Sequence, residues 1–515
     1  MALLKSIATV GGITMISRVL GFARDILIAA VLGAGFMADA FFVAFKFTNL
    51  FRRLFAEGAF SSAFVPIHVD TLEADGKKGA RRFTTEAFSM LFWTLLIVVV
   101  VVEAAMPWAM RLFAPGFLDN PERFDLVVRL SRITFPYLFF VSLVALLAGL
   151  LNAVGRFAAA AAAPILLNLC LIAAALLAVP HAETPAHALA YGLAAAGVVQ
   201  FVWLLVFAHR AGVGPVVRRP RLTEKVRRLL KRVVPMAIGA GAYQVNLVVD
   251  TVIASFLPSG AISYLYYAHQ VSQLPLGVVG VAVGTALLPL LARQLKTGEI
   301  DQAHHSQNRA LEFAFFLTLP AAAALVLMAE PVILTLFERG AFGPEEAKRT
   351  AQALTVYAVG VPAYVSVKVL SPNFFAREDT KTPVLVSLVA MIVNIVLNLM
   401  LMGPLRHVGI AVATTVSAWI NAILLGLILR KRGHLKLDQR FKFRLLRAAA
   451  AVLVMTAALW ALFHAAAPLF AMGEVHRAAG LAMLVIGGMA VYFAAALGFG
   501  AFGISDIGAV TRRSS

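Results

Sequence analysis

Long apolar runs recur along the whole chain of 515 residues, and they limit what it can fold into. A helix needs roughly 20 mostly apolar residues to cross the hydrocarbon core of a bilayer. Division of the chain at its charged loops and its Pro and Gly clusters gives about 14 such segments. The expected spans are 6–31, 36–66, 83–111, 128–153, 157–180, 187–209, 232–256, 261–293, 309–336, 350–375, 382–403, 407–430, 443–469 and 477–503. We therefore predict an all-α polytopic membrane protein.

The basic residues follow the expected membrane topology. A formal net charge of +19 could suggest a nucleic-acid-binding protein, but the bases concentrate in alternate loops. The basic loops are 77–82, 218–232, 293–296, 377–381 and 430–442, and those between them, 33–37, 181–184, 258–261 and 405–407, carry few bases. By the positive-inside rule, the basic loops and both termini are cytoplasmic. We expect anionic lipid headgroups, and no nucleic acid, to contact these loops.

Sequence motifs give no support to an enzyme. The chain has no GxxxxGK[ST] phosphate loop, no CxxC pair and no HExxH zinc motif. Its one cysteine, Cys170, excludes an intrachain disulfide. We therefore expect a non-catalytic membrane protein.

Two copies of one pattern lie about 225 residues apart. Asp25 in ARDILIAAVLGAG matches Asp250 in VVDTVIASFLPSG, and FPYLFFVS at 135–142 matches VPAYVSVK at 361–368. The second copy starts six segments after the first, so both have the same orientation, as in parallel-repeat transporters. The predicted parts are an N-lobe of six helices (1–215), a C-lobe of six (216–436) and a final helix pair (437–515). Two lobes around a cavity favour alternating access.

Charged residues interrupt the first two apolar segments. They are Arg18, Arg24, Asp25, Asp39, Lys46, Arg52, Arg53 and Glu57. An Arg or Asp at a helix centre costs about 2.5–3.5 kcal/mol on insertion scales, so these side chains must face a wet cavity or each other. More bases than acids are present, and guanidinium groups suit bidentate binding of phosphate. We therefore predict an anion-binding cavity.

Helical spacing leaves two roles open for some of these charges. Asp39, Lys46 and Arg53 recur at intervals of seven, and Glu57 follows Arg53 by four, so the four form one stripe. Such a stripe would equally serve as a set of salt bridges that locks two helices together.

The second copy has a different polar set. Asp250 lies among apolar residues, Asn394 and Asn398 share a helix face, and Thr414 lies in the next segment. An acid with amide and hydroxyl oxygens could coordinate a small hard cation. The alternative is interhelical hydrogen bonding, which is common for Asn and Thr in membranes.

Several motifs resemble one known family. They are LLKSIATVGGITMISRVLGFARDILIAAVLGAG at 3–35, MADAFFVAFKFTNLFRRLFAEGAFSSAFVPI at 37–67, ITFPYLFF at 133–140 and KTPV at 381–384. They are similar to the MurJ/MviN family, the bacterial lipid II flippases of the multidrug/oligosaccharidyl-lipid/polysaccharide exporter superfamily. The resemblance implies a monomeric multi-pass protein of the bacterial inner membrane. It would move the undecaprenyl-diphosphate-linked disaccharide pentapeptide to the outer leaflet.

The resemblance also implies roles for individual residues. Arg18, Arg24 and Arg52 would hold the diphosphate, Ser17, Asp25 and Asp39 would belong to the same cavity and its gate, and helices 13 and 14 would form a groove for the polyprenyl tail. Where many members carry a further arginine, this chain has Gln270 after His269, so either fewer bases hold the diphosphate or protonated His269 supplies the charge. Asp250, Asn394, Asn398 and Thr414 resemble a sodium site, which would be weak because Asn398 stands where an acid can occur.

No cofactor is expected. The coupling ion would be Na⁺ or H⁺, and an anion such as chloride would bind in the cavity when substrate is absent. Two rival functions share the superfamily. A cation-coupled drug exporter would need an acidic cavity, whereas a flippase for another polyprenyl-diphosphate-linked polysaccharide would share the basic one.

Overall fold

The computed structural model describes residues 2–55 and 59–502, so Glu57 lies outside the described residues. Within those ranges the secondary structure is helical, apart from an isolated bridge between Arg339 and Phe342. The predicted all-α class is confirmed.

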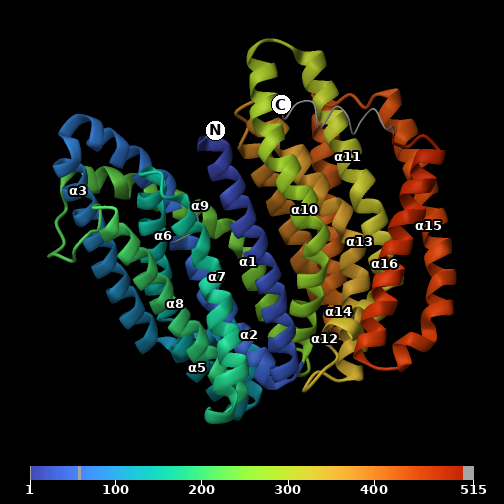
Figure 1. Ribbon diagram of the computed structural model, residues 1–515, viewed down its shortest axis with the longest axis horizontal. Helices are drawn as coiled ribbons and strands as arrows, with labels where there is room; N and C mark the ends of the chain where they lie inside the picture. Colours follow the sequence, from blue (N-terminus) through green and yellow to red (C-terminus); the bar gives the residue numbers. More distant parts are fainter. Residues whose placement is uncertain (1, 56–58, 503–515) are drawn as a thin grey trace. The chain divides into compact units, whose positions relative to one another are not determined.

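The chain divides into two compact units. The N-terminal unit comprises the residues up to Ser263 together with Arg339–Phe342, and the C-terminal unit comprises Tyr264–Glu338 and the residues from Gly343 onward. Helices of the N-terminal unit are α1 (Ala2–Leu32), α2 (Phe36–Phe55), α3 (Ala59–Ala104), α4 (Met106–Phe113), α5 (Pro121–Thr134), α6 (Tyr137–Ala153), α7 (Phe157–Ala173), α8 (Pro185–Arg210) and α9 (Glu224–Ser255). The remaining helices are α10 (Ala261–Lys296), which begins in the N-terminal unit, α11 (Ile300–Leu327), α12 (Ala329–Phe337), α13 (Pro344–Phe375), α14 (Lys381–Lys431), α15 (Gln439–Ala471) and α16 (Glu474–Gly498). Figure 1 shows both sets of helices.

Among the described residues, 10 helical segments are long and apolar enough to cross a membrane. Gly76 (φ 67°) kinks α3, and Arg406 (φ 51°) divides α14 into two of these segments. Together with α1, α2, α9 and α10, the segments are consistent with the predicted set of about 14 spans. The expected span 36–66 crosses residues 56–58, which lie outside the described ranges.

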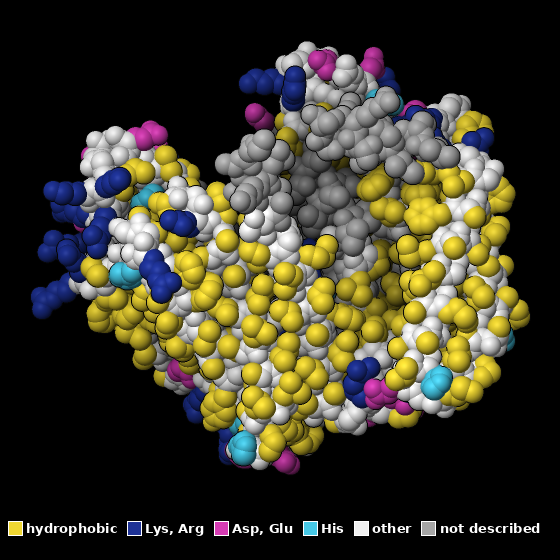
Figure 2. All heavy atoms as spheres, in the orientation of Figure 1, with side chains coloured by type: hydrophobic (Ala, Val, Ile, Leu, Met, Phe, Trp, Pro, Cys, Tyr) yellow, Lys and Arg dark blue, Asp and Glu magenta, His cyan; other side chains and the backbone are white. Residues whose placement is uncertain are grey.

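Large apolar side chains cover the outward faces of the helices (Figure 2). On α15, Leu453 and Trp460 are exposed, as are Leu176 and Leu177 after α7. Contiguous apolar surface of this kind marks contact with lipid or a partner protein. Given the length of the apolar helices, lipid is the environment that this surface fits.

Each unit has its own buried core. In the N-terminal unit, Phe64 and Phe83 of α3 pack with Leu147 of α6 and Leu229 of α9. The compact unit therefore includes α9, which the predicted lobes assign to the C-lobe. The predicted lobes rest on the sequence repeat, and the compactness of a unit does not test that repeat. The lobe boundaries therefore stay a prediction.

The C-terminal unit includes the final helix pair. Figure 1 shows α15 and α16 side by side, and α15 packs along α11. The Tyr492 hydroxyl of α16 donates to the Phe316 carbonyl of α11 at 2.6 Å. This bond, and the ring contact between the same two residues, fasten α16 to α11.

Candidate anion-binding site in the N-terminal unit

Arg24 of α1 lies in a polar contact that joins α1 to α7. Its Nε and Nη2 donate to the same oxygen of Asp25, at 3.0 and 2.7 Å, and its Nη1 donates to Oδ1 of Asn168 at 3.0 Å. Asn168 in turn donates to the Ser17 carbonyl at 2.9 Å. The Arg24 side chain is only 12% exposed. A buried guanidinium needs such charge and hydrogen-bond compensation.

Arg52 of α2 lies near the same place as Arg24. Both residues are close enough to Tyr137 of α6 for their charges to act on its buried hydroxyl. The Arg52 Nε donates to Oδ1 of Asn49 at 2.8 Å, one turn earlier on α2. The charges of two of the predicted anion-binding arginines, from different helices, therefore both reach the phenol of Tyr137.

Ser17 and Arg18 lie one to two turns before Arg24 on α1. Arg18 is exposed and Ser17 is half-buried. Arg18 and Asp25 are seven residues apart, a spacing that returns a helix to nearly the same face. The Asp25 carboxylate forms an ion pair with its neighbour Arg24.

Asp39 lies near the start of α2, fully buried, and it holds the first turn of α10. One carboxylate oxygen accepts from the Ser263 N–H at 2.9 Å and from its hydroxyl at 2.7 Å. The other accepts from the Gly260 N–H at 2.7 Å and from Nη2 of Arg123 at 3.0 Å. Asp39 thus acts as an N-cap supplied by a different helix, since it satisfies the backbone donors at a helix start.

Two further charges of the α2 stripe, Lys46 and Arg53, have partners on α9. Arg53 Nη1 donates to Oε1 of buried Gln244 at 2.9 Å. The charges of Asp250 and Asp39 both act on the Lys46 ammonium. Asp250, the residue predicted to bind a coupling cation, therefore already has a cationic neighbour.

The other predicted site residues belong to the C-terminal unit. His269 is exposed with its Nε2 3.2 Å from Nε2 of Gln273, and Gln270 is half-buried. Asn398 donates to Oδ1 of Asn394 at 3.0 Å, and Asn394 Nδ2 lies 3.4 Å from the Thr414 hydroxyl. Among the described side chains, no three His, Cys, Asp or Glu groups gather as metal ligands. The sodium site, which also needs Asp250 of the N-terminal unit, stays a prediction.

Two residues of the N-terminal site were missed by the sequence reasoning. Asn168 could have been found, because it is a polar residue inside the apolar run of α7. Arg123 gave no such signal, because it follows Pro121 in a polar stretch that resembles an ordinary loop. Its guanidinium carbon lies 3.7 Å from the centroid of the Phe117 ring, so the ring covers one face of the charge.

The fold and the site together define a class: a multi-pass helical membrane protein with buried arginines paired to acids and amides. A family model described as lipid II flippase MurJ matches residues 28–479. A probable lipid II flippase MurJ from Rhizobium meliloti (strain 1021) is 46% identical over 100% of this chain and 97% of its own. One from Vibrio cholerae is 37% identical over 96% of this chain and 95% of its own. The chain belongs to the lipid II flippase MurJ family.

Solved structures share the fold. A lipid II flippase MurJ in an inward closed conformation superposes with a TM-score of 0.77 at 23% identity, covering 97% of this chain and 99% of its own. An inward-facing multidrug resistance transporter of the MATE family gives a TM-score of 0.66 at 14% identity, over 82% of this chain and 97% of its own. At these identities the likeness concerns the fold alone.

Proposed function

We propose that this protein moves lipid II, the undecaprenyl-diphosphate-linked peptidoglycan precursor, across the bacterial inner membrane. Family membership over nearly the whole chain supports this substrate. The structural observation that carries the proposal is Arg24 of α1, a guanidinium that is only 12% exposed and is held by Asp25 and Asn168. With Arg52 of α2 as a second donor, such a guanidinium would form a receptor for a diphosphate, the charged part of such a substrate.

Asp25 gives this receptor a means of release. It accepts two donors of Arg24, Nε and Nη2, which form the edge of the guanidinium that best fits a phosphate. Phosphate binding and Asp25 pairing therefore compete for Arg24. Asn168 holds the third donor, Nη1, and keeps the guanidinium oriented while its partner changes.

In an alternating-access mechanism, the site would open first to one leaflet and then to the other. The positive-inside distribution supports a cytoplasmic location for both termini. A cation, Na⁺ or H⁺, would couple through Asp250, with Asn394, Asn398 and Thr414 as further ligands if Na⁺ binds. Lys46 would then compete with the cation for Asp250.

Growth of a bacterial strain depleted of its own lipid II flippase tests the proposal. Arg24→Ala should abolish rescue while the protein reaches the membrane in normal amount. Arg24→Lys should rescue partly, because a point charge lacks the planar fork of arginine. The control is Arg210→Ala, which removes an exposed arginine at the end of α8. Full rescue by Arg24→Ala would contradict the proposal.

A further inference from the structure

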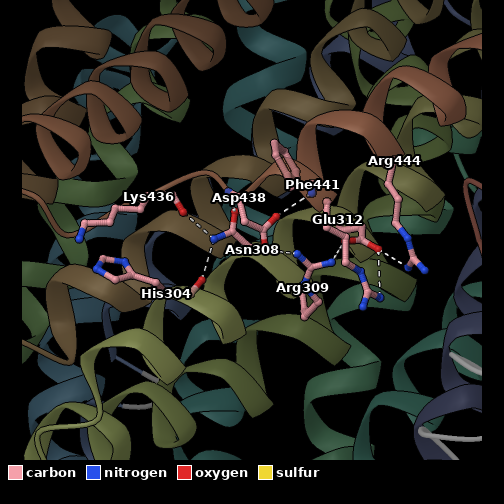
Figure 3. Close-up of polar contacts among 9 residues, drawn as sticks. His304, Asn308, Arg309, Glu312, Lys436, Asp438, Phe441 and Arg444 are labelled. Carbon is pink, nitrogen blue, oxygen red and sulfur yellow. Dashed lines mark hydrogen bonds and ion pairs between the residues drawn. The ribbon is translucent and has the colours of Figure 1, made fainter.

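Two buried amides bring three chain segments together at one end of the C-terminal unit. The first is Asn308 of α11, whose Nδ2 donates to the His304 carbonyl at 2.8 Å and to the Lys436 carbonyl at 2.7 Å. Figure 3 shows the His304 ring and the Lys436 side chain on the same side of this amide. The start of α11 is therefore joined to the segment that links α14 to α15.

The second buried amide is Asn373 of α13. Its Nδ2 donates to the His434 carbonyl at 3.2 Å, and its Oδ1 accepts from Nε of Arg377 at 3.0 Å. The same Nδ2 lies 3.5 Å from Oε1 of Gln307, the residue before Asn308. The turn after α13 thus joins the other two segments, and a fixed partner orients the Arg377 guanidinium.

One of the rings in this place is buried without a hydrogen bond. His304 is 7% exposed, and neither of its ring nitrogens has a hydrogen-bond partner. The ring lies near the His434 backbone, but the geometry falls short of a hydrogen bond. The buried Nδ1 of His434 also lacks a partner. Buried polar atoms in native proteins nearly always have a partner, so these nitrogens point to a polar ligand.

Positive charge surrounds these nitrogens. The cluster, called the α11 basic cluster below, consists of His304, Arg377, His434 and Lys436. The charges of Arg377 and Lys436 both act on the His304 ring, and that of Arg377 acts on the His434 ring. The two full positive charges would repel a metal ion, so the ligand that fits is an anion.

Two acids act on the α11 basic cluster, and neither neutralises it. Asp379 is paired with Arg432, whose Nη1 lies 2.6 Å from its carboxylate. Asp301 lies one turn before His304 and is exposed, so water screens its charge. Within the described residues, Arg377 and Lys436 form no ion pair. A net positive charge therefore remains at the cluster.

We propose that the α11 basic cluster binds a soluble phosphate monoester. Arg377 presents its Nη edge to the phosphate oxygens, Lys436 supplies a point charge, and the His304 ring donates from a buried nitrogen. Loops 377–381 and 430–442 are predicted to be cytoplasmic, so the site faces the compartment in which such phosphates are dissolved. The site uses no residue of α1 or α2 and does not depend on the proposed function.

Equilibrium dialysis against radiolabelled inorganic phosphate tests the site, with full-length protein stripped of lipid in detergent. Every protein carries Arg24→Ala, which removes the predicted anion site of the N-terminal unit. One phosphate should bind per chain. Arg377→Gln should weaken binding about 10- to 100-fold, because it removes charge-assisted hydrogen bonds. Lys436→Gln changes an exposed side chain, so it tests the site even if Arg377→Gln does not fold, and it should weaken binding about 3- to 10-fold.

The sequence repeat supplies a matched control. Asn152 and Arg156 have the same spacing in the first copy as Asn373 and Arg377 in the second, but both are exposed. Arg156→Gln removes the same charge and should leave phosphate binding intact. Unchanged binding in a folded Arg377→Gln protein, or an equal loss in Arg156→Gln, would overturn the proposal.

A last arm separates a soluble phosphate from a lipid headgroup. Phosphatidic acid in detergent micelles carries the same phosphate group on acyl chains, and glycerol phosphate carries it without them. Glycerol phosphate should displace the labelled phosphate at least as well as phosphatidic acid does. Displacement by phosphatidic acid at about tenfold lower concentration would assign the cluster to lipid and overturn the proposal, as would the absence of saturable phosphate binding.

Discussion

The two units bury different kinds of polar group. In the N-terminal unit, full charges lie inside the apolar helices, with Arg24 beside Asp25 and Asp39 on Arg123. In the C-terminal unit, Asn394 and Asn398 are fully buried amides. Burial of an ion costs several kcal/mol before it is paired, whereas a membrane amide hydrogen bond averages only about 0.6 kcal/mol. Because Asp25 and Asp39 are almost completely buried, loss of an ion-pair partner should cost most in the N-terminal unit.

Loss of one buried charge should have the largest effect. Asp39→Asn leaves Arg123 as an uncompensated buried cation and weakens the cap on the first turn of α10. We expect a loss of about 3–5 kcal/mol in the free energy of unfolding, measured by thermal denaturation in detergent. The comparison variant in the C-terminal unit, Asn398→Ala, should lose about 0.6–1.7 kcal/mol. Equal losses in the two variants would remove the contrast between the units.

Backbone crowding within the N-terminal unit should give the next largest effect. Gly33 (φ 64°) and Gly340 (φ 57°) lie where two backbone segments of the N-terminal unit cross closely. A Cβ on Gly33 would lie 2.3 Å from the Ala341 carbonyl oxygen. The Ala341 N–H donates to the Ala30 carbonyl at 2.7 Å across this crossing. Gly33→Ala should therefore lower stability by about 1–3 kcal/mol.

Gly35→Ala is the matched control for this crossing. Gly35 lies in the same link, and a Cβ added to it meets nothing within 4 Å. If the thermal midpoints of the two alanine variants agree within error, the segment Arg339–Phe342 is not held to α1 in the way described.

The comparison between the units also shows what the sequence could predict. Apolar length predicts the spans, and the cost of burying charge predicts that Arg24 and Arg52 need a polar environment. Helical spacing brings Asn394 and Asn398 together, as their hydrogen bond confirms. The partners of Asp39 could not be predicted, because Arg123 and Ser263 come from distant segments whose approach depends on tertiary packing.

A single amide in each unit allows a finer comparison, with Asn168 in the N-terminal unit. Asn168→Ala removes the acceptor that orients Arg24, so transport should fall by about tenfold, equivalent to about 1.4 kcal/mol. Asn421→Ala in the C-terminal unit removes an amide that lies 3.4 Å from the Ser387 hydroxyl, and transport should change little. Lipid II translocation by reconstituted protein is the measurement.

A double-variant cycle distinguishes positioning by Asn168 from simple structural support. If Asn168 acts through Arg24, its replacement should add little further loss in an Arg24→Lys background. Fully additive losses would show that Asn168 contributes by packing alone.

A half-buried charge in the C-terminal unit should have the smallest effect. Asp379 lies between α13 and α14, where the Thr382 hydroxyl donates to it at 2.6 Å and the Thr382 N–H at 3.0 Å. These bonds, and then Arg432, lower the pKa of Asp379 from 3.8 to about 2. Its contribution to stability is therefore fully present above pH 3.8 and is lost as the pH falls through about 2. Asp379→Asn should flatten this part of the pH profile of the thermal midpoint, and the variant and wild type should converge at the acid end.

Water screens this partly exposed pair, so the difference at neutral pH should stay below about 1 kcal/mol. A larger loss of stability at neutral pH would mean that a half-buried charge in the C-terminal unit stabilises the fold as much as a buried charge in the N-terminal unit. That result would contradict the difference expected between Asp39→Asn and Asn398→Ala.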